Sequence, residues 1–421
     1  MRPEDVERLV AETCRRAREA ARQLARLESS VKARALEAMA AGLRGGAEDI
    51  LTANARDVAD SEAAGRSAAF VDRLRLDPKR IDGMAQALGE IALLSDPVGS
   101  VESAWRRPNG IEISRVRVPI GVIAVIYESR PDVTSDCAAL CLKSGNACIL
   151  RGGSEAARSS GAIAGILLTR GIEAGLPRGF LQLVPAQDRG TLTALLRRED
   201  LIDLVVPRGG EGLIRHVVET TRIPVIKQYK GVCHVYVHRD ANLEMALSIC
   251  ENAKCQRPAT CNAMETVLVH REAAPRFLPL LAERLGPLGV TLHGCPETCR
   301  LVPAAKLADE STYDVEWLDL ELSVKVVDGL EAAADHIAAH GTGHSEAIVT
   351  ESYGAAERFL REVDAAAVYV NASTRLTDGG QFGLGAEIGI STQKLHARGP
   401  VGVRELTTCK YVIRGSGQLR Q

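Results

Sequence analysis

Apolar residues recur at helical spacing over residues 3 to about 95. Val6, Leu9 and Val10 illustrate the three- and four-residue spacing, and Ala, Leu, Arg and Glu dominate the segment. We therefore predict an all-helical leader without strands. A polar break, SDPVGS, follows it. The next stretch, IEISRVRV, alternates apolar with charged or small residues, which predicts a half-exposed strand of a hairpin that leaves the main body.

From residue 119 the pattern changes to short, continuous apolar runs that alternate with helical segments. A parallel sheet that is covered on both faces needs such runs, because its strands are buried on both sides. The pattern predicts a doubly wound α/β domain, followed by a second α/β domain. The expected strands are residues 121–127, 147–150, 180–184, 201–206 and 224–227 in the first domain, and 265–270, 323–327, 346–350 and 366–371 in the second. The tail ELTTCKYVIRG predicts one more strand after a Gly-rich, irregular segment near residue 380.

Composition and charge narrow the class of protein. A chain of 421 residues needs two or three domains, and 46% hydrophobic with 25% charged residues is typical of a soluble globular protein. The net charge of -2 gives no field that would gather nucleic acid or an anionic membrane surface. The longest apolar runs, such as GVIAVIY, are too short to span a bilayer.

The cysteines and the N-terminus indicate a compartment. Eleven cysteines are an odd count, and the first residues, MRPEDVERLVAE, are charged and unlike a secretory signal. We therefore expect mostly reduced thiols and a cytoplasmic location.

Arg151 stands where a dinucleotide fold reads the ribose of its cofactor. In such folds the residue that ends the second strand, about 20 residues past the first, is Asp or Glu for a free 2′-hydroxyl and Arg for a 2′-phosphate. Here the first strand ends at Tyr127 and the second runs into Arg151. A planar guanidinium binds a phosphate through two hydrogen bonds, so the position favours NADP(H) over NAD(H). A solvated strand-end residue is the alternative reading of Arg151.

A second glycine cluster, PRGGEG at residues 207–212, also follows a strand and opens a helix. Backbone N–H groups at such a place attract phosphate. The cluster lacks the spacing of GxGxxG, so a tight turn remains the alternative.

The stretch NAKCQRPATCN holds two candidate nucleophiles, Cys255 and Cys261, on either side of Arg257. Only a thiolate attacks, and a loop near positive charge favours it. Cys255 falls where the helical pattern ends, whereas Cys261 follows the helix-stopping Pro258 and is better placed to face a cleft. Buried packing is the usual alternative for a free cysteine.

A zinc site is the other reading of these thiols. The segment HGCPETC adds a histidine and two more cysteines, but nothing supplies two close ligand pairs at standard spacing. We therefore predict no metal. The chain also has no GxSxG or HExxH pattern.

Several stretches together resemble the gamma-glutamyl phosphate reductases, a branch of the aldehyde dehydrogenase superfamily that works in proline synthesis. The matching text is RVPIGVIAVIYESRPDVTSD, LCLKSGNACILRGGSE, DLVVPRGGEGLI, CQRPATCNAMETVLVH, HIAAHGTGHSEAIVTE and FGLGAEIGISTQKLHARGPVGVRELTTCKYVIRG. The likeness extends from the N-terminal helices to the tail.

The resemblance implies an aldehyde dehydrogenase-like α/β fold with a Rossmann-type cofactor domain, an α/β catalytic domain and a small β oligomerisation element. Residues 1–102 and 119–230 would form the NADP(H)-binding domain, and 231–385 the catalytic domain. Residues 103–118 and 386–421 would form the oligomerisation hairpin and C-terminal strand. Their exposed edges suggest a homodimer or homotetramer.

The resemblance also assigns roles to residues. Cys261 would be the nucleophile, and Glu316 would hold the nicotinamide ribose, with a surface carboxylate as its alternative reading. The cofactor-binding residues it implies are Arg151, Gly152, Gly153, Gly209, Gly210 and Glu316. The candidates for binding the substrate are Arg130, Arg257, His344, Arg375 and Glu128. A structural role is the alternative for each, such as a salt bridge for Arg257 or a turn cap for His344.

Two departures from the superfamily pattern bear on the mechanism. Hydrolytic aldehyde dehydrogenases use a Glu in an ELGG segment to activate water, and the corresponding KQYKGVC offers no carboxylate. Water activation should therefore be weak, which suits a thioester that exchanges with phosphate. Ser129 aligns with the Asn that stabilises the oxyanion in the superfamily. The second hydrogen-bond donor to the oxyanion is therefore not assigned by the resemblance.

The expected reaction is the NADPH-dependent reduction of L-gamma-glutamyl 5-phosphate to glutamate 5-semialdehyde and phosphate through a Cys261 thioester. The resemblance also raises an association with glutamate 5-kinase, which makes the labile substrate. Two alternatives stay open: another cysteine-based aldehyde dehydrogenase, hydrolytic or coenzyme A-acylating, and a non-catalytic binding protein that keeps the fold. The intact CNAMET and RGGSE stretches argue against the last.

Overall fold

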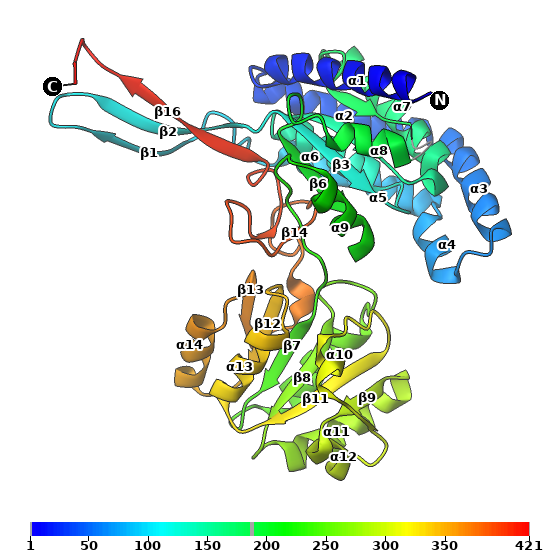
Figure 1. Ribbon diagram of the computed structural model, residues 1–421, viewed down its shortest axis with the longest axis vertical. Coiled ribbons are helices and arrows are strands. Elements are labelled where there is room, and N and C mark those ends of the chain that lie inside the picture. Colours follow the sequence, from blue (N-terminus) through cyan, green and yellow to red (C-terminus); the bar gives the residue numbers. More distant parts are fainter. Residues whose placement is uncertain (1, 186–188, 421) are drawn as a thin grey trace. The chain divides into compact units, whose positions relative to one another are not determined.

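The computed structural model describes residues 2–185 and 189–420, and within them the chain forms two compact units (Figure 1). Unit 1 comprises Met1–Lys227, Gly383–Gly389 and Val401–Gln421. Unit 2 comprises Gln228–Phe382 and Ile390–Pro400. The division of the chain into cofactor, catalytic and oligomerisation domains stays a prediction.

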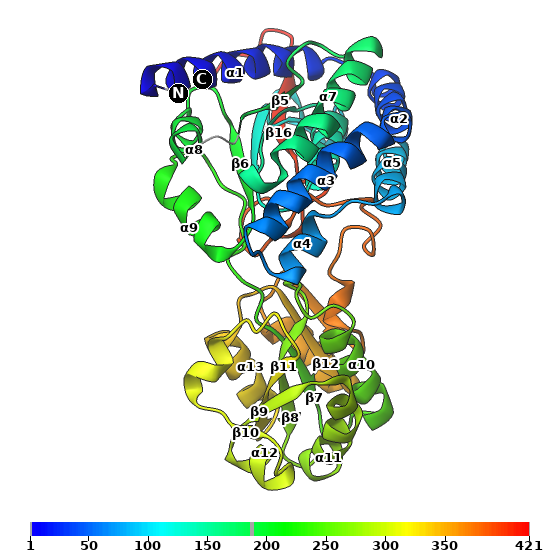
Figure 2. The ribbon, with the colours of Figure 1, turned by 90° about the vertical axis from the view of Figure 1, so that its right-hand side faces the viewer.

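The helical leader forms as its apolar spacing predicts. In the first helix Val6, Val10 and Cys14 are buried on one face, and Pro3 occupies the first turn, where its missing N–H costs nothing. Asp77 begins the fifth helix by accepting a hydrogen bond from the Arg80 N–H. The second helix packs along the fifth (Figure 2). The helices are α1 (Pro3–Leu24), α2 (Ser29–Gly45), α3 (Ala47–Ala63), α4 (Ala68–Leu74) and α5 (Pro78–Leu93).

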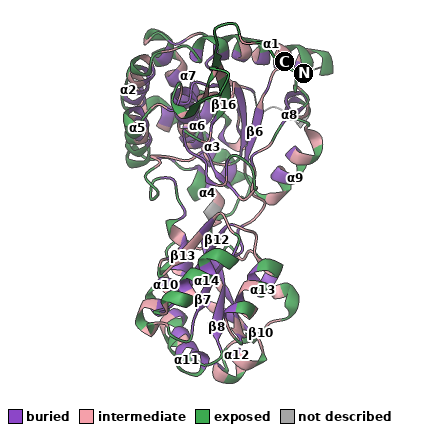
Figure 3. Cartoon of the chain, turned by 90° about the vertical axis from the view of Figure 1, so that its left-hand side faces the viewer, coloured by how far each residue is buried: buried purple, intermediate pink, exposed green. Residues whose placement is uncertain are grey.

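The described part of unit 1 holds a parallel sheet of four strands in the order β5-β4-β3-β6. Every residue of β3 is buried, which explains its unbroken apolar run. The neighbouring strand β6 is buried over most of its length as well (Figure 3). Helices α1 and α6 both lie against β3 and β4. The strands are β3 (Val122–Tyr127), β4 (Ala147–Arg151), β5 (Leu181–Leu183) and β6 (Leu204–Arg208); the helices are α6 (Val133–Lys143), η1 (Ser154–Ala156), α7 (Ala157–Glu173), α8 (Arg189–Leu196) and α9 (Glu211–Thr220).

The strand predicted at residues 224–227 is wrong. Among the described residues it pairs through a single parallel bridge, between Val205 and Val225. There the Val205 N–H donates to the Pro224 carbonyl and the Ile226 N–H to the Val205 carbonyl. Pro224 has no N–H to extend such a ladder. The apolar segment therefore pairs with the edge strand β6 at a single residue and forms no strand of its own.

The predicted hairpin and tail strand form a separate antiparallel sheet in unit 1. Its strands are β1 (Val101–Arg106), β2 (Glu112–Pro119) and β16 (Thr407–Arg414), in the order β1-β2-β16. Figure 1 shows this ribbon extending from the α/β body of the unit. Trp105 and Tyr411 pack edge to face with ring centroids 6.3 Å apart, yet both stay exposed, as does Ile413.

The described part of unit 2 is built on a parallel sheet of seven strands in the order β10-β9-β11-β8-β7-β12-β13. Its strands are β7 (Cys233–Val237), β8 (Met264–His270), β9 (Thr291–Gly294), β10 (Lys306–Leu307), β11 (Glu321–Val327), β12 (Ser345–Val349) and β13 (Ala367–Val370). The helices are α10 (Leu243–Cys255), α11 (Ala274–Leu285), α12 (Pro296–Leu301), α13 (Leu330–His340) and α14 (Tyr353–Glu362). Short pieces complete it: η2 (Gly286–Leu288), η3 (Glu310–Asp314), η4 (Thr374–Leu376), β14 (Ile390–Ser391) and β15 (Gly399–Pro400).

The apolar pattern missed β7, although it is a wholly buried strand of unit 2. His234 and Tyr236 interrupt its apolar run and point to one face of the sheet, while Val235 and Val237 pack into the core on the other. A polar residue in a buried strand hides the strand from a reading of hydropathy alone.

His336, on α13, is buried among other titratable groups. Its ring packs edge to face against Tyr313 at 5.0 Å and His234 at 5.5 Å, and lies 4.5 Å from the His340 ring. Burial, with smaller contributions from the charges of His234, Lys325 and His340, lowers the pKa of His336 to about 2. His336 is therefore neutral in the folded protein at every pH above that value.

A neutral buried histidine makes stability depend on pH. The pKa of His336 is lowered on folding, so its contribution is complete above pH 6.5 and is lost as the pH falls toward 2. We expect the free energy of unfolding to fall by about 1.4 kcal/mol per pH unit below pH 6.5 through this residue. Urea unfolding of His336→Phe between pH 6.5 and 5 should show a flatter dependence than the wild type.

The control is His216→Phe, which removes an exposed histidine from α9. It should keep the wild-type pH dependence. Equal slopes for the wild type and His336→Phe would contradict the assignment.

Two further findings concern membranes and disulfides. In the described residues, the helices are all too short or too polar to cross a bilayer. The eleven cysteines all lie in that part of the chain, and each carries a free thiol.

Candidate active site

Cys261 lies in a loop between α10 and β8, at the edge where the strands of the unit 2 sheet begin. Cys233 of β7 pairs with Met264 of β8, so the residues before these two strands meet at one edge. Cys261 is half-buried. Cys255 is the last residue of α10, and burial raises its pKa. The structure thus separates the two thiols of the sequence motif: Cys255 ends a helix and Cys261 occupies the loop.

Gly231 presses against the backbone of Cys261. A Cβ atom built on Gly231 would lie 1.8 Å from the Cys261 carbonyl oxygen, so only glycine fits there. The Cys233 thiol donates to the same carbonyl at 3.2 Å. Gly231 and Cys233, at the start of β7, therefore both contact the carbonyl group of Cys261. The sequence spacing did not predict these contacts.

Glu316 is brought to this place as well. Its carboxylate accepts a hydrogen bond from the Gly231 N–H at 2.7 Å. Glu316, the residue predicted to bind the nicotinamide ribose, thus contacts Gly231, which in turn contacts Cys261. Its role toward a ribose stays a prediction.

Arg375 ties the two ends of the Cys261 loop together. Its Nε donates to Gln256 Oε1 at 2.9 Å, and its Nη1 donates to Asn262 Oδ1. Asn262 in turn donates to the Thr377 carbonyl at 2.9 Å. Burial lowers the pKa of Arg375, as does the nearby charge of Arg257, while Cys261 acts in the opposite sense. Both predicted cations therefore lie within electrostatic range of the loop, and Arg375 also positions it.

His344, predicted as a substrate contact, is fully buried just before β12. Its Nδ1 lies 2.8 Å from Ser345 Oγ and 3.7 Å from the Cys233 sulfur. Ser345 Oγ lies 2.6 Å from Thr377 Oγ1, which joins His344 to the chain that anchors Asn262. His344 is thus buried next to the residues that support the Cys261 loop. A direct contact between His344 and substrate stays a prediction.

A buried ion pair flanks the Cys261 loop, with one partner before the loop and the other after it. The sequence did not predict this pair. Lys254, near the end of α10, pairs with Glu265, at the start of β8, at 2.7 Å, and both side chains are fully buried. Burial raises the pKa of Glu265 to about 7, although Lys254 opposes the shift. The one available signal was a charged residue at the start of an otherwise apolar strand, METVLVH.

In unit 1 the predicted cofactor residues collect at the carboxyl ends of β3, β4 and β6. The strand order places β3 between the other two, so the three following loops are neighbours. Arg151 is the last residue of β4 and is half-buried. Gly152 lies against the Tyr127 ring, where an added Cβ would come within 3.1 Å of it.

Carboxylates join these loops. The Ser129 N–H and hydroxyl both donate to Glu155 Oε1, at 2.8 and 3.0 Å, and Ser129 holds a left-handed φ of 50°. A Cβ on Gly153 would lie 2.2 Å from the same oxygen. The Gly210 N–H donates to Glu128 Oε2 at 3.1 Å at the start of α9. Arg130, in the same β3 loop, is half-buried.

The donor set at these loop ends suits the diphosphate of a dinucleotide cofactor. The Gly210 N–H and the Ser129 N–H already bind carboxylate oxygens, and a Cβ on Gly209 or Gly153 would collide with these carboxylates, so the missing side chains let acidic oxygens approach the backbone. A helix N-terminus with bare glycines binds phosphate through the same groups. Gly209 and Gly210 would hold that diphosphate, and Arg151 the ribose end.

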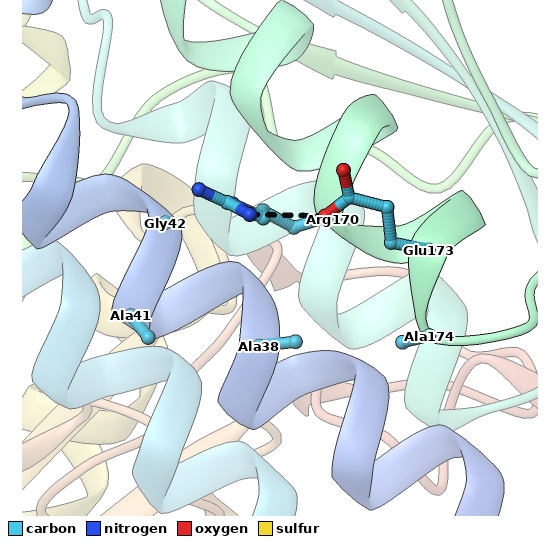
Figure 4. Close-up of a pocket in the computed structure, with 6 residues that line it drawn as sticks. All are labelled: Ala38, Ala41, Gly42, Arg170, Glu173 and Ala174. Atoms are coloured by element: carbon cyan, nitrogen blue, oxygen red, sulfur yellow. Dashed lines mark hydrogen bonds and ion pairs between the residues drawn. The ribbon is translucent and has the colours of Figure 1, made fainter.

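Other candidate sites offer less. Figure 4 shows a pocket of about 440 Å³ between α2 and α7, lined by Ala38, Ala41, Gly42, Arg170, Glu173 and Ala174. Its charged pair, Arg170 and Glu173, is bonded at 3.0 Å, so it presents no convergent set of polar groups and we assign it no function. Over the described residues, His, Cys, Asp and Glu side chains form no group that could hold a metal ion.

The family model described as Aldehyde dehydrogenase family matches residues 3–303. With the α/β fold and the loop cysteine, the match shows that the chain belongs to the aldehyde dehydrogenase family, and it confirms the predicted fold class. An acetylating aldehyde dehydrogenase from Geobacillus thermoglucosidasius shares that fold, with a TM-score of 0.73 at 18% identity over 100% of each chain.

Closer relatives place the chain within that family. It is 57% identical to a gamma-glutamyl phosphate reductase of Moorella thermoacetica over 96% of this chain and 97% of the relative. It is 54% identical to that of Caldanaerobacter subterraneus subsp. tengcongensis over 97% and 98%. The crystal structure of the reductase from Thermotoga maritima superposes with a TM-score of 0.95 at 45% identity, covering 98% and 100%. The chain thus falls in the gamma-glutamyl phosphate reductase branch, as the sequence motifs predicted.

Proposed function

We propose that the protein reduces L-gamma-glutamyl 5-phosphate to L-glutamate 5-semialdehyde and phosphate, with NADPH as reductant and Cys261 as nucleophile. The observation that carries the proposal is a half-buried cysteine in a loop held on both sides, in a chain 57% identical to a named reductase. Proline biosynthesis is the process in which such a reductase takes part.

The chemistry follows from Cys261 and its surroundings. The thiolate attacks the acyl carbon, and the oxyanion accepts from backbone N–H groups, among them that of Cys261. Phosphate leaves as the C–O bond breaks, and a thioester remains. When bound, NADPH supplies the hydride that reduces this thioester. Breaking the C–S bond then releases the aldehyde and restores the thiolate.

The cations beside the loop have a place in this sequence. Arg257 and Arg375 lie within electrostatic range of each other and would favour the thiolate and meet the leaving phosphate. Arg130 and His344 remain candidates for the substrate's carboxylate and ammonium ends. Ser129 is the second oxyanion candidate; its hydroxyl donates to Glu155.

The direct test is the reverse reaction. Glutamate 5-semialdehyde with NADP⁺ should be oxidised only when phosphate is present, with an acyl phosphate as product. A free acid or an acyl-coenzyme A as the product would instead make the protein a hydrolytic or coenzyme A-acylating aldehyde dehydrogenase.

We also propose that Arg151 selects NADP(H) over NAD(H). A charge-assisted hydrogen bond contributes about 1.5–3 kcal/mol, so Arg151→Ala should raise the Kd for NADPH about 10- to 100-fold and change that for NADH little. Isothermal titration with both cofactors measures this. Arg151→Lys, which keeps the charge but loses the two-pronged contact, should fall between. Equal losses for the two cofactors would exclude Arg151 as the selecting residue.

The partners are proposals as well. The exposed Trp105, Tyr411 and Ile413 on the β1-β2-β16 sheet support a homodimer or homotetramer, which sedimentation analysis would establish. Association with glutamate 5-kinase would protect the labile acyl phosphate during transfer. Reduced thiols on every cysteine suit a cytoplasmic location.

A further inference from the structure

The loop after β3 is tied to both of its neighbours by carboxylates. Glu155, from the β4 side, accepts two hydrogen bonds from Ser129. Glu128, from the β3 loop itself, accepts one from the Gly210 N–H on the β6 side. The two carboxylates differ in the number of hydrogen bonds that they accept and in the backbone groups that they contact.

Glu128 covers the place where a cofactor diphosphate would bind. Gly210 is the N-cap of α9, a helix of 10 residues, and its N–H is one of the donors that such a helix leaves unpaired. A Cβ on Gly209 would lie 2.3 Å from Glu128 Oε2, so the carboxylate rests on both glycines of the cluster. A carboxylate oxygen and a phosphate oxygen are the same kind of acceptor for this N–H.

Two anions cannot share that donor. Their charges would repel at contact distance, in a place where the N–H offers a single hydrogen bond. We propose that Glu128 is an internal competitor for the cofactor's diphosphate and that cofactor binding must displace its carboxylate. This inference rests on the proposed cofactor site and deepens it.

Glu155 has a different role. Its two bonds at 2.8 and 3.0 Å hold Ser129 in a left-handed conformation, and its oxygen rests on Gly153 rather than on the α9 terminus. When Glu128 leaves Gly210, the β3 loop therefore stays attached to the β4 side. The Glu128 N–H also donates to the Arg208 carbonyl at 3.1 Å, so displacement of the carboxylate moves the Glu128 side chain while the backbone of the loop stays attached to β6.

The effect on affinity follows from the occupied fraction. If the carboxylate covers Gly210 about nine-tenths of the time, the apparent Kd of the cofactor is about tenfold above its intrinsic value. Glu128→Ala should therefore bind NADPH about tenfold more tightly than the wild type. Glu128→Gln, which keeps the shape but carries no charge, should show a smaller gain.

Glu211→Gln is the matched control. Glu211 lies in the first turn of the same helix, and its carboxylate pairs with Arg215 at 2.5 Å instead of covering the glycines. It removes the same charge near the same terminus, so its Kd for NADPH should change less than about twofold through screened repulsion. A gain equal to that of Glu128→Ala would show a general charge effect and would overturn the competition.

Isothermal titration with three ligands separates the possible failures. NADPH and inorganic pyrophosphate should both bind Glu128→Ala more tightly than the wild type, whereas adenosine 2′-monophosphate, which has no diphosphate, should bind both equally. Unchanged or weaker binding of NADPH and pyrophosphate by both Glu128 variants overturns the inference. A wild type that binds no NADPH overturns the proposed cofactor instead, and the pyrophosphate comparison still decides whether Glu128 competes.

Discussion

Cys261→Ser is expected to lower kcat by at least about a thousandfold while leaving the fold and the affinity for NADPH unchanged. A serine hydroxyl is not ionised at neutral pH, so no thioester can form. The loop itself should survive, because the contacts of Cys261 with Gly231 and Cys233 are made through its carbonyl group. Steady-state kinetics in the phosphate-dependent direction measures the loss, and circular dichroism checks the fold.

Cys255→Ser is the matched control, since Cys255 lies at the other end of the same motif and is also half-buried. It should keep most of the activity. Mass spectrometry of enzyme mixed with substrate should find the acyl adduct on the peptide that contains Cys261. A normal rate for Cys261→Ser, or an adduct at another cysteine, would end the covalent mechanism proposed for this residue.

Lys254→Met is expected to destabilise the protein by about 3–5 kcal/mol at pH 8, because it leaves the Glu265 carboxylate buried without its counter-charge. The loss should shrink as the pH falls below 7. The pKa of Glu265 is about 7 even beside Lys254, so removal of the cation raises it further and the folded variant takes up a proton. Urea unfolding at pH 8 and at pH 6 measures both effects.

The double variant Lys254→Met/Glu265→Gln tests the cause. It removes both charges, so it should recover much of the stability lost at pH 8 and show no comparable dependence on pH. Lys325→Met offers a control, because Lys325 pairs with Glu310 at a partly exposed site at 3.0 Å. A loss for Lys254→Met that is as small as that of Lys325→Met would mean that the buried pair contributes little.

Much of the fold could be predicted from local patterns of apolar and polar residues in the sequence. The helical leader has apolar residues at helical spacing, and buried strands such as β3 have continuous apolar runs, because helices and strands bury residues with different periods. The pattern failed where tertiary context overrode it. β7 carries His234 in a wholly buried strand because Glu346 on β12 bonds its ring at 2.9 Å, a partner that lies far away in sequence.

The candidate site shows the same division. Strand-end position, the glycine cluster, the place of a thiol in a loop and motif likeness together singled out Cys261, Arg151, Gly209 and Gly210. It could not show that Gly231 touches the Cys261 carbonyl, that Arg375 bonds both ends of the nucleophile loop, or that Glu128 rests on Gly210. Each of these contacts joins segments brought together only when strands align at a common edge of a sheet.

By itself, the sequence determined the class of fold, the family and the sulfur atom proposed to react, because periodicity and motif are properties of neighbouring residues. The tertiary structure alone decided which carboxylates lie against which backbone N–H groups and which buried charges are paired. Those relations depend on the order in which parallel strands assemble, and no local pattern in the chain encodes the distance between two loops that follow different strands.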